Sequence, residues 1–219
     1  MRNGTRQILD SLIERYPPLF VCKNSIESAF NIFSDCYVNN GKLLICGNGG
    51  SAADAEHIVG ELMKGFMHKR PISNRDRDAI FANLGENAES HYLINHLQSA
   101  LPAISLVSHS ALMTAFNNDV QPDLVFAQQV YGYGRQEDVV VGLSTSGNSK
   151  NVVYAMKIAK AFGLKTVALT GQHGGELKEI VDACICVPAN STPIIQEYHL
   201  PVYHVLCMMV ESEEYGVKT

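Results

Sequence analysis

The chain has 219 residues, which is enough for one well-buried hydrophobic core. Hydrophobic residues make up 46% of it and charged residues 18%, a balance that excludes a mostly disordered protein. The formal net charge of -5 argues against a nucleic-acid partner. No apolar run reaches membrane-spanning length, and the N-terminal residues lack the apolar core of a signal peptide, so we expect no membrane partner and a cytoplasmic location.

Helical patterns open the chain, over residues 4–16 and 24–39. Five short apolar runs then alternate with further helical patterns, as in parallel strands that are buried on both faces. The predicted strands are 42–46, 103–107, 139–143, 166–169 and 183–187. The other predicted helices are 51–66, 76–86, 88–100, 123–133, 149–163, 175–181 and 194–214. This order predicts an α/β fold, a doubly wound five-stranded parallel sheet flanked by helices, with ligands at the carboxyl ends of the strands.

No repeat or low-complexity linker divides the chain, so we expect residues 1–219 to form a single domain. The segment 65–102 is long for a connection and is predicted to be an inserted helical segment. Pro201 lies within the last predicted helix, which it should kink or interrupt with a turn.

The six cysteines are predicted to be free. Cys46, Cys184 and Cys186 fall in strand-like runs, where a free cysteine behaves as a small hydrophobic residue. The only close pair, Cys184 and Cys186, is expected to point to opposite faces of its strand. Neither a disulfide framework nor a thiolate zinc site is therefore expected.

A glycine-rich turn follows the first predicted strand, with Asn48, Gly49, Gly50 and Ser51 in succession. Glycines allow backbone N–H groups to approach an anion, and Ser51 could cap the following helix, whose N-terminus attracts negative charge. The turn matches neither a dinucleotide-binding motif nor a P-loop. By itself it fits an ordinary strand-to-helix turn as well as a phosphate site.

The turn after the third predicted strand is richer in hydroxyl groups. Four of them occur within six residues, on Ser144, Thr145, Ser146 and Ser149. A helix cap needs only one, so this set predicts a site for a phosphate monoester. The turn 170–175 is interpreted as a tight turn and no more.

Ionisable and amide side chains form a second group of candidates. His57 and Glu61 are one helical turn apart, and spacing alone favours a structural pair. The last predicted helix adds further candidates, which are Gln196, Glu197, His199 and His204. Their spacing leaves open both a zinc site with a free coordination position and an acid–base pair.

Five segments together resemble the SIS (sugar isomerase) family, and more closely its phosphoheptose isomerase branch. They read CGNGGSAADAEHIVGEL, NND, GLSTSGNSKNV, ALTG followed two residues later by GG, and IQEYHLPVYH. The resemblance runs in order from the first helix to the last, and only residues 65–102 depart from it. It implies a homotetramer with active sites shared between subunits.

The resemblance also implies an activity and a set of site residues. The branch interconverts sedoheptulose 7-phosphate and D-glycero-D-manno-heptose 7-phosphate. The implied substrate-binding residues are Asn48, Gly49, Gly50, Ser51, Asp119, Ser144, Thr145, Ser146, Ser149 and Gln196. The implied ligands of one zinc ion per subunit are His57, Glu61, Gln196 and His204. Glu197 and His199 are then left as structural or outer groups.

Aldose–ketose isomerisation moves a proton between adjacent carbons through an enediol, so it needs a base at carbon and a protonated or polarised oxygen. By resemblance, Glu61 is the base and His204 the acid. Glutamine is a poor zinc ligand, and a metal-free acid–base pair stays open.

One departure bears on the substrate. The branch usually reads ELxGRF where this chain has Glu61-Leu62-Met63-Lys64-Gly65-Phe66, so Gly65 replaces an expected arginine. Lys64, Lys69 or Arg70 could replace that basic contact. The alternative functions are an isomerase of another phosphorylated or anionic sugar and a non-catalytic SIS protein that binds the replication initiator. A sugar-phosphate-sensing regulator is less expected, because no DNA-binding module precedes the core.

Overall fold

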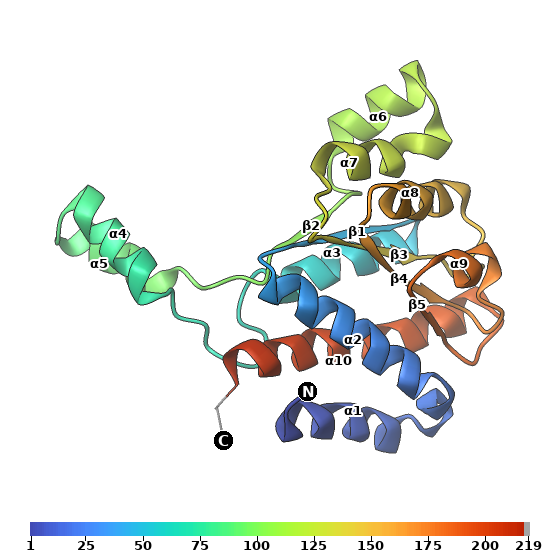
Figure 1. Ribbon diagram of the computed structural model, residues 1–219, viewed down its shortest axis with the longest axis horizontal. Helices are drawn as coiled ribbons and strands as arrows, with labels where there is room; N and C mark the ends of the chain where they lie inside the picture. Colours follow the sequence, from blue (N-terminus) through green and yellow to red (C-terminus); the bar gives the residue numbers. More distant parts are fainter. Residues whose placement is uncertain (217–219) are drawn as a thin grey trace.

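The computed structural model describes residues 1–216 and is built around a five-stranded parallel sheet (Figure 1). From edge to edge the strands are β2 (Ala103–Ser105), β1 (Leu43–Gly47), β3 (Val139–Leu143), β4 (Lys165–Thr170) and β5 (Ala183–Cys186). In the register of the sheet, Leu43 of β1 pairs with Ala103 of β2 on one side and with Val139 of β3 on the other. The predicted fold class is confirmed.

Helices cover both faces of the sheet (Figure 1). One layer holds α2 (Lys23–Val38), α3 (Gly50–Leu62) and α10 (Thr192–Tyr215), and α1 (Asn3–Arg15) packs against α10 on the side away from the sheet. The other layer holds α6 (Ser110–Asp119), α7 (Val125–Tyr133) and α8 (Lys150–Ala161). The helix α9 (Gly175–Ile180) links β4 to β5. There are also two short 3-10 helices, η1 (Pro17–Cys22) and η2 (Pro122–Leu124). Leu43 and Ile45 pack into the core under the first layer, and Leu44 and Cys46 into the core under the second. Burial on both faces explains why the strands read as continuous apolar runs.

The strand order places β1 between β2 and β3, so the chain reverses its winding direction at β1. The carboxyl ends of β1 and β3 are therefore neighbours, and α3 and α8 begin beside each other at this edge on opposite faces of the sheet. In doubly wound sheets the crevice at such a reversal is where ligands bind.

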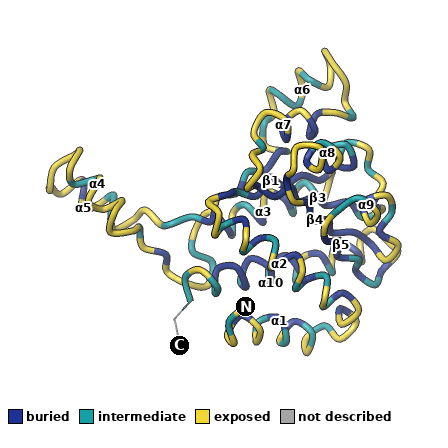
Figure 2. Tube along the Cα trace, in the orientation of Figure 1, coloured by how far each residue is buried: buried dark blue, intermediate teal, exposed yellow. Residues whose placement is uncertain are grey.

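Two helices, α4 (Asn74–Leu84) and α5 (Ala88–His96), form a hairpin that stands away from the rest of the protein (Figures 1 and 2). We call residues 74–96 the arm. Its turns are well capped, by Ser73 at α4 and by a capping box of Asn87 and Ser90 at α5. Ser90 is the only buried residue in either helix. Local hydrogen bonds therefore define the arm, rather than packing against the core.

The base of the arm is anchored by a carboxylate within α10. Glu211 accepts hydrogen bonds from the backbone N–H groups of Phe66, Met67 and His68 at 2.8, 2.6 and 3.2 Å. It also pairs with Arg70 Nε at 2.7 Å, and both charged side chains are completely buried. We call residues 63–70 the strap.

The strap also explains why α3 ends at Leu62 rather than at the predicted residue 66. The Leu62 carbonyl accepts from Arg70 Nη1 and from the Leu101 N–H. The Phe66 N–H, which would have continued the helix, bonds to Glu211 instead.

Two further elements differ from the predictions. A helix, α6, occupies residues 110–119, where none was predicted. The last helix is unbroken through Pro201, so the expectation of a turn there is wrong. Proline leaves the Glu197 carbonyl without its helical donor, but Glu197 is exposed and water can satisfy it. Within residues 1–216, no helix combines the length and apolarity needed to cross a bilayer.

The expectation for the cysteine pair is also wrong. Cys184 and Cys186 point to the same face of β5, with their Sγ atoms 3.6 Å apart. Side chains alternate along a strand, so residues two apart share a face. All six cysteines are free thiols.

Candidate active site

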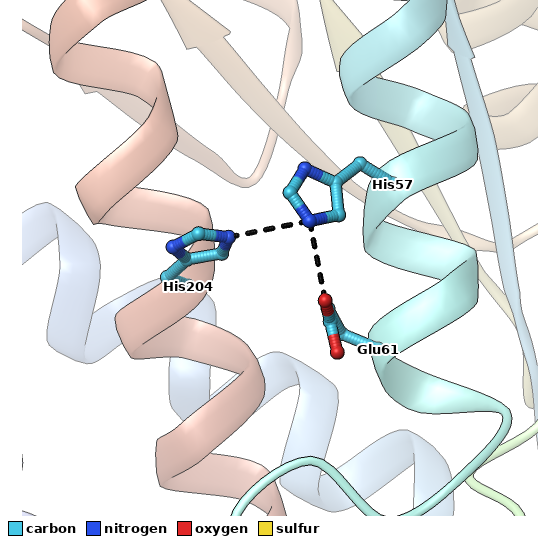
Figure 3. A group of neighbouring side chains, drawn as sticks. All are labelled: His57, Glu61 and His204. Atoms are coloured by element: carbon cyan, nitrogen blue, oxygen red, sulfur yellow. Dashed lines mark hydrogen bonds and ion pairs between the residues drawn. The ribbon is translucent and has the colours of Figure 1, made fainter.

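Three ionisable side chains converge where α3 lies along α10 (Figure 3). His57 and Glu61 project from successive turns of α3, with Nε2 and Oε1 3.1 Å apart. His204 projects from α10, and its Nε2 lies 3.5 Å from that of His57. One ligand atom from each of the three lies within 4.8 Å of the others. The structure thus brings together Glu61 and His204, which lie far apart in the sequence.

Tyr203 orients the imidazole of His57. Its hydroxyl lies 2.9 Å from His57 Nδ1 and donates to Asp54 Oδ1 at 3.2 Å. With that proton committed to Asp54, the hydroxyl accepts from His57 Nδ1–H, which leaves the lone pair of His57 Nε2 facing the cluster.

This tautomer makes His57 Nε2 and Glu61 Oε1 two acceptors that face each other. A proton or a cation between them resolves the conflict. Two imidazoles and one carboxylate also match the donor set of a catalytic zinc site with an open position. The residues present therefore fit the implied metal.

The electrostatic surroundings keep Glu61 ionised. Burial raises the pKa of its carboxyl, but the hydrogen bond and charge of Lys64, together with those of His57 in its protonated form, outweigh burial and lower the pKa. Lys64 Nζ lies 3.0 Å from Glu61 Oε2. Desolvation, reinforced by His57, lowers the pKa of His204. The neutral imidazole is the form that binds metal.

The hydroxyl-rich turn after β3 folds into a compact loop at the start of α8. Ser144 Oγ and Ser149 Oγ lie 2.9 Å apart, Ser144 is buried, and Ser146 is exposed. Gly147 has a positive φ of 68°, and a Cβ on it would collide with the Gly174 carbonyl. Ser149 is the N-cap residue of α8, but its hydroxyl accepts no cap bond from a backbone N–H of the helix.

The turn after β1 meets this loop through a pair of amides. The Asn48 and Asn151 side chains exchange two hydrogen bonds of 2.9 Å. Gly49, at a φ of 58°, is the N-cap of α3, and Ser51 makes no side-chain cap bond, so Ser51 does not cap the helix as expected. Ser51 is buried in the first turn of α3.

Gln196 and Asp119 are placed differently from each other. The Gln196 carboxamide lies against Gly50, where a Cβ would come within 2.4 Å of Nε2. Gln196 therefore reaches the glycine turn from α10, two helical turns before His204. Asp119 is exposed at the end of α6, and the partner of its carboxylate among the described residues is the neighbouring Asn118.

The conformation of the strap determines which of the basic residues after Glu61 can contact the site. Arg70 is buried against Glu211, and Lys69 is exposed, whereas Lys64 contacts the site. A Cβ on Gly65 would lie 2.4 Å from the His68 carbonyl and 2.9 Å from Gln98 Oε1. The backbone of the strap thus excludes an arginine at residue 65.

Sequence reasoning missed three residues of the site, namely Asp54, Asn151 and Tyr203. Asp54 lies one turn before His57, and Tyr203 precedes His204, so helical spacing could have suggested both. Nothing in the sequence signals the pairing of Asn151 with Asn48, which depends on β1 and β3 being neighbours.

The chain matches the model of the SIS domain over residues 21–89 and 91–171. It is 38% identical to a phosphoheptose isomerase of Akkermansia muciniphila over 96% of each chain. It is 36% identical to one of Synechocystis over all of this chain and 97% of the relative.

Solved structures agree with these sequence matches. A phosphoheptose isomerase from Francisella tularensis has a TM-score of 0.73 and 28% identity, covering 96% of this chain and 97% of that one. One from Neisseria gonorrhoeae has a TM-score of 0.69 and 31% identity, covering 94% and 93%.

Proposed function

Because the chain belongs to the phosphoheptose isomerase family of SIS-domain proteins, we propose that it interconverts sedoheptulose 7-phosphate and D-glycero-D-manno-heptose 7-phosphate. The observation that carries this proposal is the convergence of Glu61 and His204 on one face of the α3–α10 pair. A purely binding protein has no need for this arrangement, which argues against the non-catalytic alternative.

The phosphate is proposed to bind at the reversal of the sheet. Hydroxyls of Ser51, Ser144, Thr145, Ser146 and Ser149, together with the backbone of Gly49 and Gly50, would hold its oxygens at the starts of α3 and α8. Asn48, Asp119 and Gln196 are proposed to contact sugar hydroxyls. Support comes from the Asn48–Asn151 amide pair, which joins the two turns. Asp119 is exposed, and its carboxylate accepts a hydrogen bond from the neighbouring Asn118 side chain.

Glu61 is proposed as the base that removes the proton from the carbon beside the carbonyl. Its lowered pKa keeps it an acceptor at neutral pH. His204 would donate a proton to the carbonyl oxygen, giving the enediol. Glu61 would then return its proton to the adjacent carbon while His204 takes up the proton of the other enediol hydroxyl, which becomes the new carbonyl. The lowered pKa of His204 favours donation from a neutral imidazole N–H.

We propose His57, Glu61 and His204 as ligands of one zinc ion, with Gln196 as a fourth. Zinc at this position would polarise the sugar oxygens and favour their deprotonation. Glu61 has one oxygen facing His57 and the other facing Lys64.

We also propose a homotetramer of single-domain subunits in the cytoplasm. The support for the assembly is family membership together with the exposed arm.

A second candidate is an isomerase of another phosphorylated or anionic sugar. The strap favours it, because the backbone around Gly65 excludes arginine and Lys64 is the cation beside Glu61. A different cation at this position would change which sugar hydroxyls are recognised.

A coupled turnover assay across a panel of ketose phosphates tests these proposals. We expect turnover of sedoheptulose 7-phosphate, and a loss of roughly 10²- to 10⁴-fold in Glu61→Gln. Exposed His173→Gln is the matched surface control. Turnover of a hexose but not a heptose phosphate would establish the second candidate. Full activity of Glu61→Gln would remove the base assignment, and full activity after chelation, with no zinc remaining, would remove the zinc role.

A further inference from the structure

A pair of thiols lies at the carboxyl end of β5, the edge strand of the sheet. Cys184 Sγ and Cys186 Sγ are 3.6 Å apart. The hydroxyl of Thr170, on neighbouring β4, lies 3.6 Å from the first sulfur and 3.5 Å from the second. Both cysteines are partly exposed, whereas the other four are buried. Small solutes can therefore reach this pair of thiols more readily than the others.

We propose that Cys184 and Cys186 together bind one soft, thiophilic metal cation as two thiolates. Zinc–sulfur bonds of about 2.3 Å at a tetrahedral angle place two sulfurs about 3.8 Å apart. The observed separation of 3.6 Å is already close to that value. Thiolates are the ligands that soft cations select, and the partial exposure leaves room for water as a further ligand.

A disulfide fits this geometry less well. It requires the sulfurs to close to about 2.05 Å and the Cα atoms to lie within about 6.8 Å. Two residues along a strand are about 6.6 Å apart, which is near that limit. The backbone of β5 is fixed by its pairing with β4, so bridging needs a distortion that metal binding does not.

Proton release is consistent with binding as thiolates. A divalent cation and two thiols give a dithiolate complex and two protons. The hydrogen bond from the Cys184 thiol lowers the pKa of Cys186 against the effect of burial, and Thr170 and the Lys178 ammonium act in the same direction. That bond raises the pKa of Cys184. Binding of the cation displaces the protons of both thiols.

Gly174 lies close to the pair and carries no side chain that would crowd it. Its φ is 77°, and a Cβ on it would lie 3.1 Å from Cys186 Sγ. This site is chemically distinct from the group formed by His57, Glu61 and His204, which offers nitrogen and oxygen atoms and no sulfur.

Cadmium titration of the full-length, reduced and chelator-treated protein under anaerobic conditions tests the proposal. Cadmium bound to thiolates gives an ultraviolet charge-transfer band, which imidazole and carboxylate ligands do not produce. We expect the band to saturate at one sulfur-bound cadmium per chain. The band should persist in His57→Ala/His204→Ala and disappear in Cys184→Ser/Cys186→Ser, which retains the four buried cysteines.

A second measurement tests the proposal without the double serine variant, in case that variant does not fold. In the wild-type protein, cadmium should protect Cys184 and Cys186 from alkylation by N-ethylmaleimide, as mapped by peptide mass spectrometry. The proposal is overturned if the wild-type protein gives no band, or if a folded Cys184→Ser/Cys186→Ser variant gives the same band. Protection of other cysteines in place of this pair overturns it too. So does a disulfide that forms between the two under mild oxidation when cadmium does not bind.

Discussion

Tyr203 is the residue that fixes the chemical character of His57. It accepts from the imidazole on one side and donates to Asp54 on the other. Such outer partners of a metal-binding histidine set its tautomer and raise its basicity. The direction in which the His57 lone pair points therefore depends on a hydroxyl group outside the cluster.

Tyr203→Phe should weaken zinc binding and turnover together, by roughly 10- to 100-fold, because His57 loses its orienting partner. Zinc affinity can be measured by competition with a chelating dye, and kcat and KM by the coupled assay. Tyr198→Phe, on the same helix, is the matched control. Unchanged zinc affinity in folded Tyr203→Phe would show that the hydroxyl does not orient His57.

His199 should make the protein sensitive to mild acid. It is fully buried, and desolvation lowers its pKa from 6.5 to about 4 against the opposing effect of its hydrogen bond with the Thr170 carbonyl. Between pH 6.5 and 4, His199 is therefore protonated in the unfolded chain but neutral in the folded protein. The free energy of unfolding falls as the pH drops through this range. The loss is at most about 3 kcal/mol.

His199→Gln should flatten the dependence of the unfolding free energy on pH in this window, because glutamine does not titrate. Urea unfolding at a series of pH values measures it. Exposed His173→Gln should leave the slope unchanged. An identical slope in wild-type and His199→Gln proteins would contradict the prediction.

At the scale of elements, the loop between β3 and α8 is held by its own short contacts. Ser149 is the N-cap residue of α8, yet its hydroxyl bonds to Ser144 rather than to the helix. That hydroxyl is therefore available to a ligand without loss of a cap.

Ser149→Ala should raise KM for the sugar phosphate with little change in stability. The loss of one hydrogen bond to a charged group is about 1.5–3 kcal/mol, or roughly 10- to 100-fold in affinity. Inorganic phosphate inhibition and KM are the measurements. Ser191→Ala, at the N-cap of α10, is the control, since Ser191 also makes no side-chain cap bond. An equal effect of both substitutions would argue against a phosphate contact at Ser149.

The arm is a separable element, because its helices bury so little of themselves. Replacing residues 74–96 by a short Gly-Ser link should leave the thermal midpoint of the rest of the protein nearly unchanged. Helices of 11 and 9 residues are marginal alone, so we expect the arm to be stabilised by contacts in an assembly. Light scattering should then give fewer chains per particle. An unchanged number of chains per particle and an unchanged substrate preference would identify the arm as peripheral.

Most elements were predictable because their signals are local. The strands and most helices follow from runs such as Val139–Leu143, which are apolar throughout. The end of α3 could not be predicted, because it depends on hydrogen bonds with Glu211 and Arg70, which lie outside the helix. The helix α6 has no fully buried residue and places only Met113 and Phe116 against the core, so its apolar stripe is too short to stand out in the sequence.

The site divides in the same way. The hydroxyl turn and the His57–Glu61 spacing are visible in the sequence, but their meeting with His204 required the packing of α10 on α3. The hydroxyl turn indicated a phosphate site by itself, whereas the roles of His57, Glu61 and His204 came from family resemblance. The roles of Tyr203 and Asp54 follow from three-dimensional contacts.

At the scale of the whole molecule, the buried Glu211–Arg70 pair joins the strap, the base of the arm and α10. Glu211→Ala should lower the unfolding free energy by about 3–5 kcal/mol, because it leaves a buried guanidinium without its partner. Chemical denaturation measures this. Glu176→Ala, at the exposed ion pair with Lys157, should cost about 1 kcal/mol or less. Equal losses of unfolding free energy in the two variants would show that the buried ion pair stabilises the fold no more than an exposed one does.

The Glu211 carboxylate should also determine how the enzyme loses activity on heating. Phe66 carries two roles, since its N–H binds Glu211 and its ring lies 5.6 Å from that of His204. The neighbourhood of the proposed reacting groups thus cannot loosen without exposing a buried charge. Thermal loss of activity should therefore coincide with cooperative unfolding, and there should be no temperature range in which the protein is folded but inactive.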